Sequence, residues 1–492
     1  MTKRLFPGIL LFVLLVSAVV HYSQWDYPFL YIGYTLLVSV GYLLVFLSTK
    51  RGSVAHFLLI YGLLSLLIGF FLHTFPFSPT VRLMLSGEEF FLLLKYALIN
   101  LIGQEFISMR EKDFILPLVR SFFLAVLVGL IINTYGFSPY YSFPTPTGPY
   151  SVGTQTYEFK QDYYHQDILK LDIDSVTYMY QLFYPSPSQA QGSPIGFKGL
   201  KKIQTHTYEQ LPIQAGESYP ILFYSPGAGG SRFDNLSQIE ELVSQGYIVA
   251  ALEHPYLTDI RYADGQYLKA YNFPKSAHPS YDMPGLAHHL RIAQIQDVAD
   301  EVLNHSTEGM DSLFSQIDSR QVGIFGWSIG GSAAVELCVS NPIFKAGINL
   351  DGWGFMELSP GKNRFQSPFL YLRSDVKPAT RWDVFGTGKS LEDVWEMEVR
   401  QVERERELIN TSPVPVFAYI IEEAFHSNIR DHGLLGVSRL GPIHPERCNE
   451  IVSQSVKRFF DQYLKGDSQE DFEEWAETEE ELVRTNRIIT RP

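Results

Sequence analysis

The chain has 492 residues, too many for one ordinary domain, and carries 39 Lys and Arg against 53 Asp and Glu, a net charge of −14. Residues 1–135 hold nine Lys and Arg and six Asp and Glu, so the rest of the chain is strongly acidic and lacks the clustered positive charge that nucleic-acid binding needs. Two cysteines, and no CxxC or HExxH spacing, exclude a disulfide framework and a recognisable metal site. We therefore predict no metal, no cofactor and no nucleic-acid partner.

Five apolar stretches occupy the first 135 residues, and each approaches the roughly 20 residues that a helix needs to cross a bilayer core. They span residues 5–22, 29–47, 54–72, 89–108 and 114–133. The first is short and follows Lys3 and Arg4, as in a signal peptide. Because four further spans follow, we interpret it as an uncleaved membrane helix. The sequence thus predicts an all-α, multi-pass, five-helix transmembrane domain over residues 1–135.

The loops between these stretches predict the orientation of the chain in a cell membrane. One side holds Arg82 alone, and the other holds Lys3, Arg4, Lys50, Arg51, Arg110 and Lys112. An excess of Lys and Arg in short loops marks the cytoplasmic face. The amino terminus is therefore expected inside, and five spans place residues 136–492 outside the cytoplasm.

Residues 136–156 alternate Pro with Gly, Ser and Tyr, which is typical of an extended, unpacked linker. A domain over residues 157–465 follows, in which apolar strands alternate with helical segments such as 235–245 and 287–303. The predicted strands are 176–184, 221–225, 248–252, 321–325, 346–350, 369–373 and 415–421. This alternation predicts an α/β fold with a mostly parallel sheet covered by helices.

Two segments of the second half stand apart from this alternation. Residues 376–412 are charged and helical in pattern, and this insertion either caps a site or decorates the surface. The tail over residues 466–492 packs nine acidic residues between Asp467 and Glu481, a run typical of a solvated helix face or of disorder.

The most informative motif is Gly326-Trp327-Ser328-Ile329-Gly330, which follows an apolar strand and precedes a helical segment. A strand, a sharp turn and a helix form the nucleophile elbow of α/β-hydrolases, whose serine lies on a strained bend. The residues two before and two after the serine must then be nearly without side chains, which Gly326 and Gly330 are. We predict Ser328 to be a catalytic nucleophile.

The partners of such a serine follow it in the order acid, then histidine. Asp351 ends the strand over 346–350, and His426 follows the strand over 415–421. His426 would accept the Ser328 proton, and a buried carboxylate would hold its imidazole in the required tautomer. Asp375, after the strand over 369–373, is the alternative acid. His254 precedes the nucleophile in the chain, so we interpret it as structural or pocket-lining.

An oxyanion hole requires backbone N–H groups aimed at the negative charge that develops on the substrate oxygen. One is expected from Ile329, directly after the nucleophile. The other is expected from Ala228, in the glycine-rich turn Ser225-Pro226-Gly227-Ala228-Gly229 that follows a strand.

These motifs together resemble the plasma, or type II, platelet-activating-factor acetylhydrolase family over residues 220–430. The resemblance rests on the oxyanion turn, the segment from Tyr247 to His254, the elbow, Leu350-Asp351-Gly352-Trp353 and Phe425-His426-Ser427-Asn428. It implies an α/β-hydrolase fold, Asp351 as the acid, a calcium-independent mechanism, and cleavage of short or oxidised acyl groups from phospholipids. Pro226 stands where the family usually has histidine.

The sequence therefore predicts a membrane-anchored serine ester hydrolase that acts on lipid esters, or on another small ester, at the bilayer. A cutinase-like or general carboxylesterase or lipase is the alternative within the same chemistry. A membrane sensor or transporter with a non-catalytic hydrolase-like domain is the alternative from another class, and the presence of Ser328, Asp351 and His426 disfavours it.

Overall fold

The computed structural model of the protein describes residues 140–162, 168, 175–188, 193–198, 202–271, 283–308, 312–352, 364–375, 390–435, 440–467 and 471–484. They belong to Pro139–Pro492, the second of two units into which the chain divides. The five predicted membrane spans lie in residues 1–135, outside the described residues. No helix within the described ranges has the length and apolar character needed to span a membrane.

The strands are β1 (Tyr140–Ser142), β2 (Ser151–Asp162), β3 (Ser175–Ser186), β4 (Ser193–Lys198), β5 (Lys202–Glu209), β6 (Tyr219–Ser225), β7 (Ile248–Leu252), β8 (Ile260–Arg261), β9 (Tyr267–Leu268), β10 (Ile317–Trp327), β11 (Ala346–Leu350), β12 (Phe369–Ser374), β13 (Val416–Ile421) and β14 (Leu482–Arg484). The helices are α8 (Leu236–Ser244), α9 (Met283–Glu308), α10 (Ile329–Ser340), α11 (Leu391–Thr411), α12 (His432–Leu435), α13 (Pro445–Phe460) and α14 (Phe472–Ala476), with the short turns η2 (Phe314–Gln316), η3 (His426–Ile429) and η4 (Asp461–Lys465).

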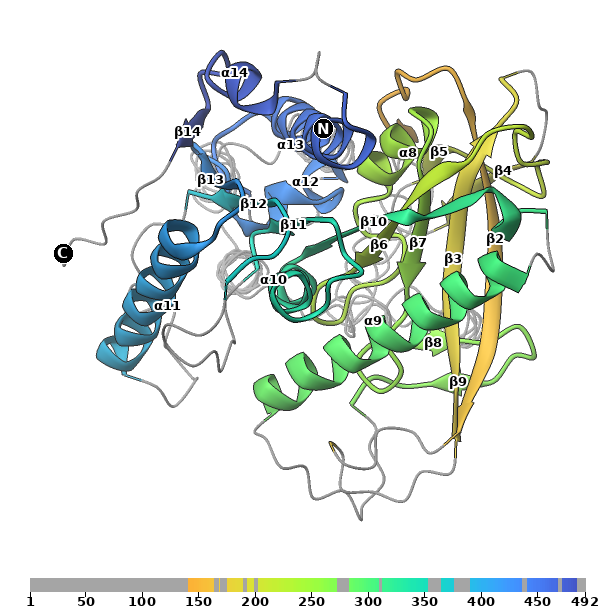
Figure 1. Ribbon diagram of the computed structural model, residues 1–492, viewed down its shortest axis with the longest axis horizontal. Coiled ribbons are helices and arrows are strands. Elements are labelled where there is room, and N and C mark those ends of the chain that lie inside the picture. The colour runs from red at the N-terminus through yellow and green to blue at the C-terminus, as the bar shows by residue number, and fades with distance from the viewer. Residues whose placement is uncertain are drawn as a thin grey trace, which may run out of the picture. The chain divides into compact units, whose positions relative to one another are not determined.

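A 12-stranded sheet organises these elements, in the order β1-β5-β2-β3-β7-β6-β10-β11-β12-β13-β14 with β4 paired to β5 (Figure 1). The six strands from β7 to β13 along this path are parallel to their neighbours. Antiparallel pairs at β3 and β14 extend the parallel core at its two ends. The seven predicted strands all belong to this sheet, so a mostly parallel sheet is confirmed.

Helices cover both faces of the sheet, with α9 and α10 on one side and α8 and α13 on the other (Figure 1). Strand β6 illustrates why the central strands of the sheet are apolar along their whole length. Ile221 and Phe223 join the core beneath α9 and α10, whereas Leu222 and Tyr224 join the core beneath α8 and α13. Because successive side chains point to opposite faces, a strand covered on both sides has no polar face.

The amino-terminal end of the sheet differs from the predicted linker over residues 136–156. Residues 140–142 form β1, and β2 begins at Ser151. Residues 143–150, here called the strap, dock on α8: the Thr147 backbone N–H and hydroxyl donate to Glu241 at 2.8 and 2.6 Å, and the Gly148 N–H donates to Ser244 Oγ at 3.0 Å. These residues therefore do not form an unpacked linker, because tertiary partners satisfy their backbone polar groups.

The carboxyl-terminal segments also pack. In the acidic tail, Phe472 and Ala476 of α14 are fully buried, and β14 pairs with β13. Arg447 of α13 accounts for part of the acidic charge by pairing with Glu479 and Glu481 at 2.5 and 2.8 Å. Within the predicted insertion, α11 packs its Leu408 into the core that lies under α9 and α10. Helix α11 therefore contributes to the cover of the sheet through Leu408.

The strap supplies a test of the fold. A Cβ added at Gly148 would lie 2.0 Å from the Ser244 carbonyl oxygen, so Gly148→Ala must displace the strap from α8. We expect a loss of about 1–3 kcal/mol in the free energy of unfolding, as for other overpacked sites. Urea unfolding of the full chain, followed by tryptophan fluorescence, measures it. Ser142→Ala, at an exposed position of β1, is the matched control, and equal midpoints for the two variants would contradict strap docking.

Candidate active site

Ser328 lies on a sharp bend between β10 and α10. Its backbone has φ +57° and ψ −130°, a conformation that residues with side chains rarely adopt. A Cβ on Gly326 would lie 2.4 Å from the Gly330 carbonyl carbon, and one on Gly330 would lie 2.0 Å from the Ser225 carbonyl oxygen. The structure thus has the predicted strand–turn–helix geometry, and the two glycines are required by contact between backbones.

Asp351 follows β11 and also has a positive φ, +55°. Its side chain accepts hydrogen bonds from the backbone N–H of Ser374 at 2.9 Å and from the Ser374 hydroxyl at 2.6 Å. The buried Asn349 side chain closes the turn, because its amide accepts from the Gly352 N–H and donates to the Gly352 carbonyl. Ser374 and Asn349 therefore set the position of the carboxylate.

His426 joins the two turns. Its Nδ1 lies 2.6 Å from Asp351 Oδ2, and its Nε2 lies 3.2 Å from Ser328 Oγ. A proton on Nδ1 donated to the carboxylate leaves the Nε2 lone pair to accept the serine hydroxyl. The His426 side chain is 39% exposed and that of Asp351 is 5% exposed, so solvent reaches the imidazole but hardly reaches the acid.

The side chain of Asp351 is held in its ionised, carboxylate form. Burial alone would raise the pKa of this carboxyl, but the hydrogen bond and charge of His426, with the charge of Arg373, hold the pKa below its ordinary value. An ionised carboxylate next to Nδ1 stabilises an imidazolium. The three side chains are arranged for nucleophilic acyl transfer at Ser328.

Asp375, the alternative acid, makes different contacts. Its Oδ2 accepts the backbone N–H of Glu423 at 3.1 Å, and its own N–H donates to the Ala424 carbonyl. These bonds hold together the loop that leads to His426. The structure therefore brings Asp351, rather than Asp375, to the imidazole.

The loop after His426 is fastened by buried polar side chains for which the sequence predicted no role. Asn428 accepts the N–H groups of Phe425 and Gly441 at 2.9 and 2.8 Å. Asp431 accepts the backbone N–H and the hydroxyl of Ser237 at the start of α8. Burial raises the pKa of Asp431 to about 7 despite these bonds. In the sequence, Asn428 was signalled by its place in the motif around His426, and Asp431 only by its proximity to His426.

Trp327, in the elbow motif itself, packs against the base. Its ring stacks on the His426 imidazole with centroids 4.5 Å apart at 29°, and its Nε1 donates to the His426 carbonyl at 3.2 Å. The Arg430 guanidinium lies 4.0 Å from the centre of the same indole and pairs with Asp234. The indole thus restricts both the ring and the backbone of His426.

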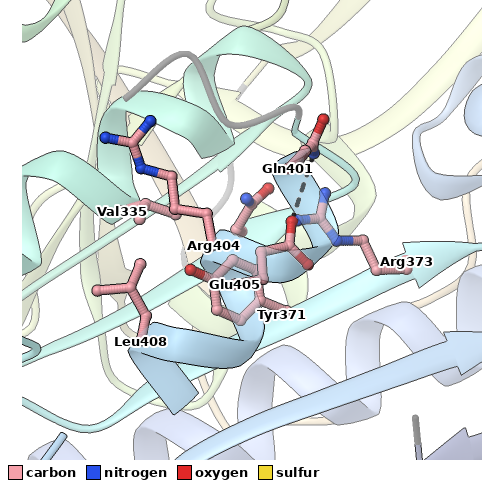
Figure 2. A pocket seen from close by; sticks show the side chains of 8 residues that line it. Val335, Tyr371, Arg373, Gln401, Arg404, Glu405 and Leu408 are labelled. Atoms are coloured by element: carbon pink, nitrogen blue, oxygen red, sulfur yellow. Dashed lines mark hydrogen bonds and ion pairs between the residues drawn. The ribbon is translucent and has the colours of Figure 1, made fainter. Parts of the chain in front are cut away.

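Arg373 supports the acid turn from behind. It donates to the Gly352 carbonyl and to Glu405 of α11. Figure 2 shows the small pocket between β12 and α11 in which Arg373, Tyr371, Gln401 and Glu405 meet. Asn349 and Arg373, which line this pocket, also hydrogen-bond to Gly352, so we assign the pocket to support of the turn at Asp351.

The oxyanion turn runs beside the nucleophile. A Cβ on Gly227 would lie 3.1 Å from Ser328 Cβ and 2.3 Å from the Trp327 ring. The next residue, Ala228, is exposed, and Ile329 is the first residue of α10, where N–H groups have no partner within the helix. Both predicted donors thus belong to turns that adjoin Ser328.

His254 lies behind this turn and is fully buried. Its Nε2 contacts Ser225 Oγ at 2.9 Å and its Nδ1 contacts Gln294 Oε1 at 2.9 Å. Burial, with the charge of Arg291, lowers its pKa well below the ordinary value, so it is neutral. The structure places it in a supporting role, as expected from its place in the chain.

Within the described residues, no group of His, Cys, Asp and Glu side chains could hold a metal ion. Cys338 and Cys448 are both buried and unpaired with each other, and burial raises the pKa of each thiol.

Comparison with known proteins extends these observations. Residues 135–260 and 288–484 match the family model described as platelet-activating factor acetylhydrolase, isoform II. The platelet-activating factor acetylhydrolase of Cavia porcellus is 24% identical over 388 residues, which cover 70% of this chain and 82% of that protein. A probable 1-alkyl-2-acetylglycerophosphocholine esterase of Arthroderma benhamiae is 26% identical over 188 residues, or 38% of this chain and 43% of that protein.

Among solved structures, the ferulic acid esterase from Streptomyces cinnamoneus matches with a TM-score of 0.52 at 24% identity. The match covers 68% of this chain and 96% of that chain. At this identity the likeness concerns the fold alone, and it supports the α/β-hydrolase fold.

The two carboxylates can be separated by matched substitutions. Asp351→Asn keeps the side-chain shape but removes the charge and favours the wrong tautomer of His426, so we expect kcat for ester hydrolysis to fall about 10⁴-fold. Asp375→Asn retains an oxygen for the Glu423 N–H, so its kcat should stay close to that of the unmodified protein. Steady-state kinetics, with circular dichroism to verify folding, compares them. A larger loss for Asp375→Asn would transfer the role of acid to Asp375.

Proposed function

The chain belongs to the platelet-activating factor acetylhydrolase isoform II family, and we propose that within it the protein is a serine ester hydrolase in which Ser328, His426 and Asp351 form the catalytic triad. The observation that carries the proposal is the continuous hydrogen-bonded path from Ser328 Oγ through His426 to Asp351. The strained backbone of Ser328, at the carboxyl end of a central strand, supports the same role.

The reaction follows from these positions. His426 Nε2 takes the proton of Ser328 as Oγ attacks the ester carbonyl, and Asp351 stabilises the resulting imidazolium without itself being protonated. The N–H groups of Ala228 and Ile329 would bind the oxyanion. Collapse of the tetrahedral intermediate returns the proton to the leaving alcohol. Water then hydrolyses the acyl-enzyme by the same path, and no metal or cofactor takes part.

We propose that the substrates are lipid esters with short or oxidised acyl chains. The names of the relatives from Cavia porcellus and Arthroderma benhamiae, an acetylhydrolase and an acetylglycerophosphocholine esterase, support a short acyl group on a glycerophospholipid. The alternative, a cutinase-like or general carboxylesterase, would use the same triad on simpler esters.

We further propose that the protein is a multi-pass protein of the cell membrane whose hydrolase domain lies outside the cytoplasm. The support is the sequence of residues 1–135: five apolar stretches of nearly membrane-spanning length, with basic loop residues gathered on one side. A bilayer anchor would keep the enzyme beside lipid substrates.

Ser328→Ala tests the chemistry. Removal of Oγ should lower kcat on a 2-acetyl glycerophospholipid by about 10⁶-fold, as the loss of a triad nucleophile does elsewhere. It should also abolish labelling by a fluorophosphonate probe while circular dichroism stays unchanged. Turnover or labelling that persists in the variant would refute Ser328 as the nucleophile.

Substrate choice is read in the same assay. Hydrolysis of simple short-chain esters without any hydrolysis of 2-acetyl or oxidised phospholipids would favour the general carboxylesterase. A protein that is folded and inert toward every ester and toward the probe would favour the non-catalytic sensor.

Protease treatment tests the membrane topology. Intact cells or spheroplasts exposed to protease should lose the hydrolase domain, because five spans deliver it to the outer side. A cytoplasmic enzyme monitored in the same sample is the control for intact membranes. A hydrolase domain that stays protected until the membrane is broken would place it, and its substrates, in the cytoplasm.

A further inference from the structure

Arg291 of α9 is a fully buried cation directed at the oxyanion turn. Its Nη1 donates to the Pro226 carbonyl at 2.7 Å and to Ser225 Oγ at 3.3 Å, and its Nη2 lies 3.5 Å from the Gly227 carbonyl. In the described part of the chain, these backbone and hydroxyl oxygens are the partners of its guanidinium, and its Nε has none.

Burial of the Arg291 guanidinium without a paired carboxylate costs free energy, so a function of this side chain is expected. A buried arginine is normally compensated by a carboxylate, because a charge moved from water into the protein interior loses its hydration. The carboxylate of Glu253, which acts on Arg291 electrostatically, is paired instead with Arg232 at 2.8 Å. Burial lowers the pKa of Arg291 to about 10, so the guanidinium is still charged at neutral pH.

We propose that Arg291 is a positioning residue of the oxyanion hole: it holds the carbonyl groups of Pro226 and Gly227 so that the next N–H, that of Ala228, is aimed at the substrate oxyanion. The inference deepens the function proposed above and rests on it.

Peptide geometry links Arg291 to Ala228. The Gly227 carbonyl and the Ala228 N–H belong to one planar trans peptide unit, so they point in opposite directions. The carbonyl is held on the inner side by the Gly230 N–H at 3.1 Å and faces Arg291 Nη2. The Ala228 N–H is therefore directed to the outer side of a turn whose Gly227 adjoins Ser328.

The charge of Arg291 adds to this orientation. A donor on the carbonyl polarises its peptide unit and strengthens the N–H as a donor. A fixed positive charge behind the turn also favours the negative charge that develops in front of it, at no cost of reorganisation during the reaction.

The groups around Arg291 keep it in place without adding a second charge. The neutral His254 donates from Nδ1 to Gln294 Oε1, which is set by the donation of Gln294 Nε2 to the Pro255 carbonyl at 2.8 Å. His254 Nε2 then accepts the Ser225 hydroxyl, and the oxygen of that hydroxyl accepts from Arg291. Each hydrogen bond in this series therefore has one defined donor and one defined acceptor.

The test compares an oxoester with its thionoester in Arg291→Met and Arg291→Lys. Sulfur accepts hydrogen bonds weakly, so thionoester hydrolysis depends less on the oxyanion donors. For the oxoester we expect Arg291→Met to lower kcat about 10- to 100-fold, less than complete loss of a donor, with little change in KM. The thionoester should lose much less, so the oxoester-to-thionoester rate ratio falls. Arg291→Lys retains the charge but replaces the two guanidinium nitrogens that contact the turn by one ammonium nitrogen, and should be intermediate.

Arg447→Met is the matched control, because it removes an arginine held by three acidic residues far along the chain from the turn. It should lower the melting temperature and leave the rate ratio unchanged. An unchanged ratio in folded Arg291→Met, or equal losses on both esters, would overturn the inference. If Arg291→Met does not fold, the ratio in Arg291→Lys decides. Failure of the unmodified protein to react with a fluorophosphonate would instead refute the proposed function.

Discussion

Direct contact between backbones, where three strands end together, is the constraint on which the rest of the site depends. The turns after β6, β10 and β11 touch at positions that tolerate no side chain. A Cβ on Gly330 would lie 2.0 Å from the Ser225 carbonyl oxygen, and a Cβ on Gly352 would lie 2.1 Å from the Ser328 carbonyl oxygen. The turn after Ser225, Ser328 and Asp351 therefore share one rigid frame. That rigidity is what allows Ser328 and Asp351 to keep positive φ angles, which isolated turns would relax.

His426 lies on a loop outside these three turns, and mostly polar contacts fix that loop to neighbouring helices and to the elbow. Its loop is tied to α8 through Asp431 and Ser237, to α13 through Asn428 and Cys448, and to the elbow through the stacked Trp327 ring. The Asp431 carboxylate and the Asn428 side-chain oxygen each accept hydrogen bonds, which offsets the free-energy cost of burying them. In its described residues the loop contains only two short helical turns, η3 and α12, and pairs with no strand of the sheet, so side-chain hydrogen bonds and ring packing hold it in position.

The sheet extends beyond its parallel centre through strands from both ends of the described residues. The amino-terminal strands β1 to β5 lie at one end, with the strap between β1 and β2 docked on α8, and the carboxyl-terminal β14 pairs with β13 at the other end. An open strand edge offers unpaired N–H and C=O groups to other chains, so covering the β13 edge with a short, charged strand limits such pairing. The acidic run is thereby folded into the domain, with Arg447 neutralising part of it.

The sequence by itself determined the parallel centre of the sheet, the order of its strands along the chain and the elbow. Strands buried on both faces are continuous apolar runs, and the elbow needs glycines at fixed spacing, so both leave a local signal around Ser328. Local pattern did not reveal strands β1, β2, β4 and β5, the packing of the strap or the use of the tail, because their polar residues are satisfied by partners distant in the chain. Other features were decided only by the tertiary structure. They are the contact of His426 with Asp351 rather than Asp375, the support of His426 by Trp327 and Asn428, and the direction of Arg291 toward the oxyanion turn. Each depends on the distance between residues tens to hundreds of positions apart, which folding alone sets.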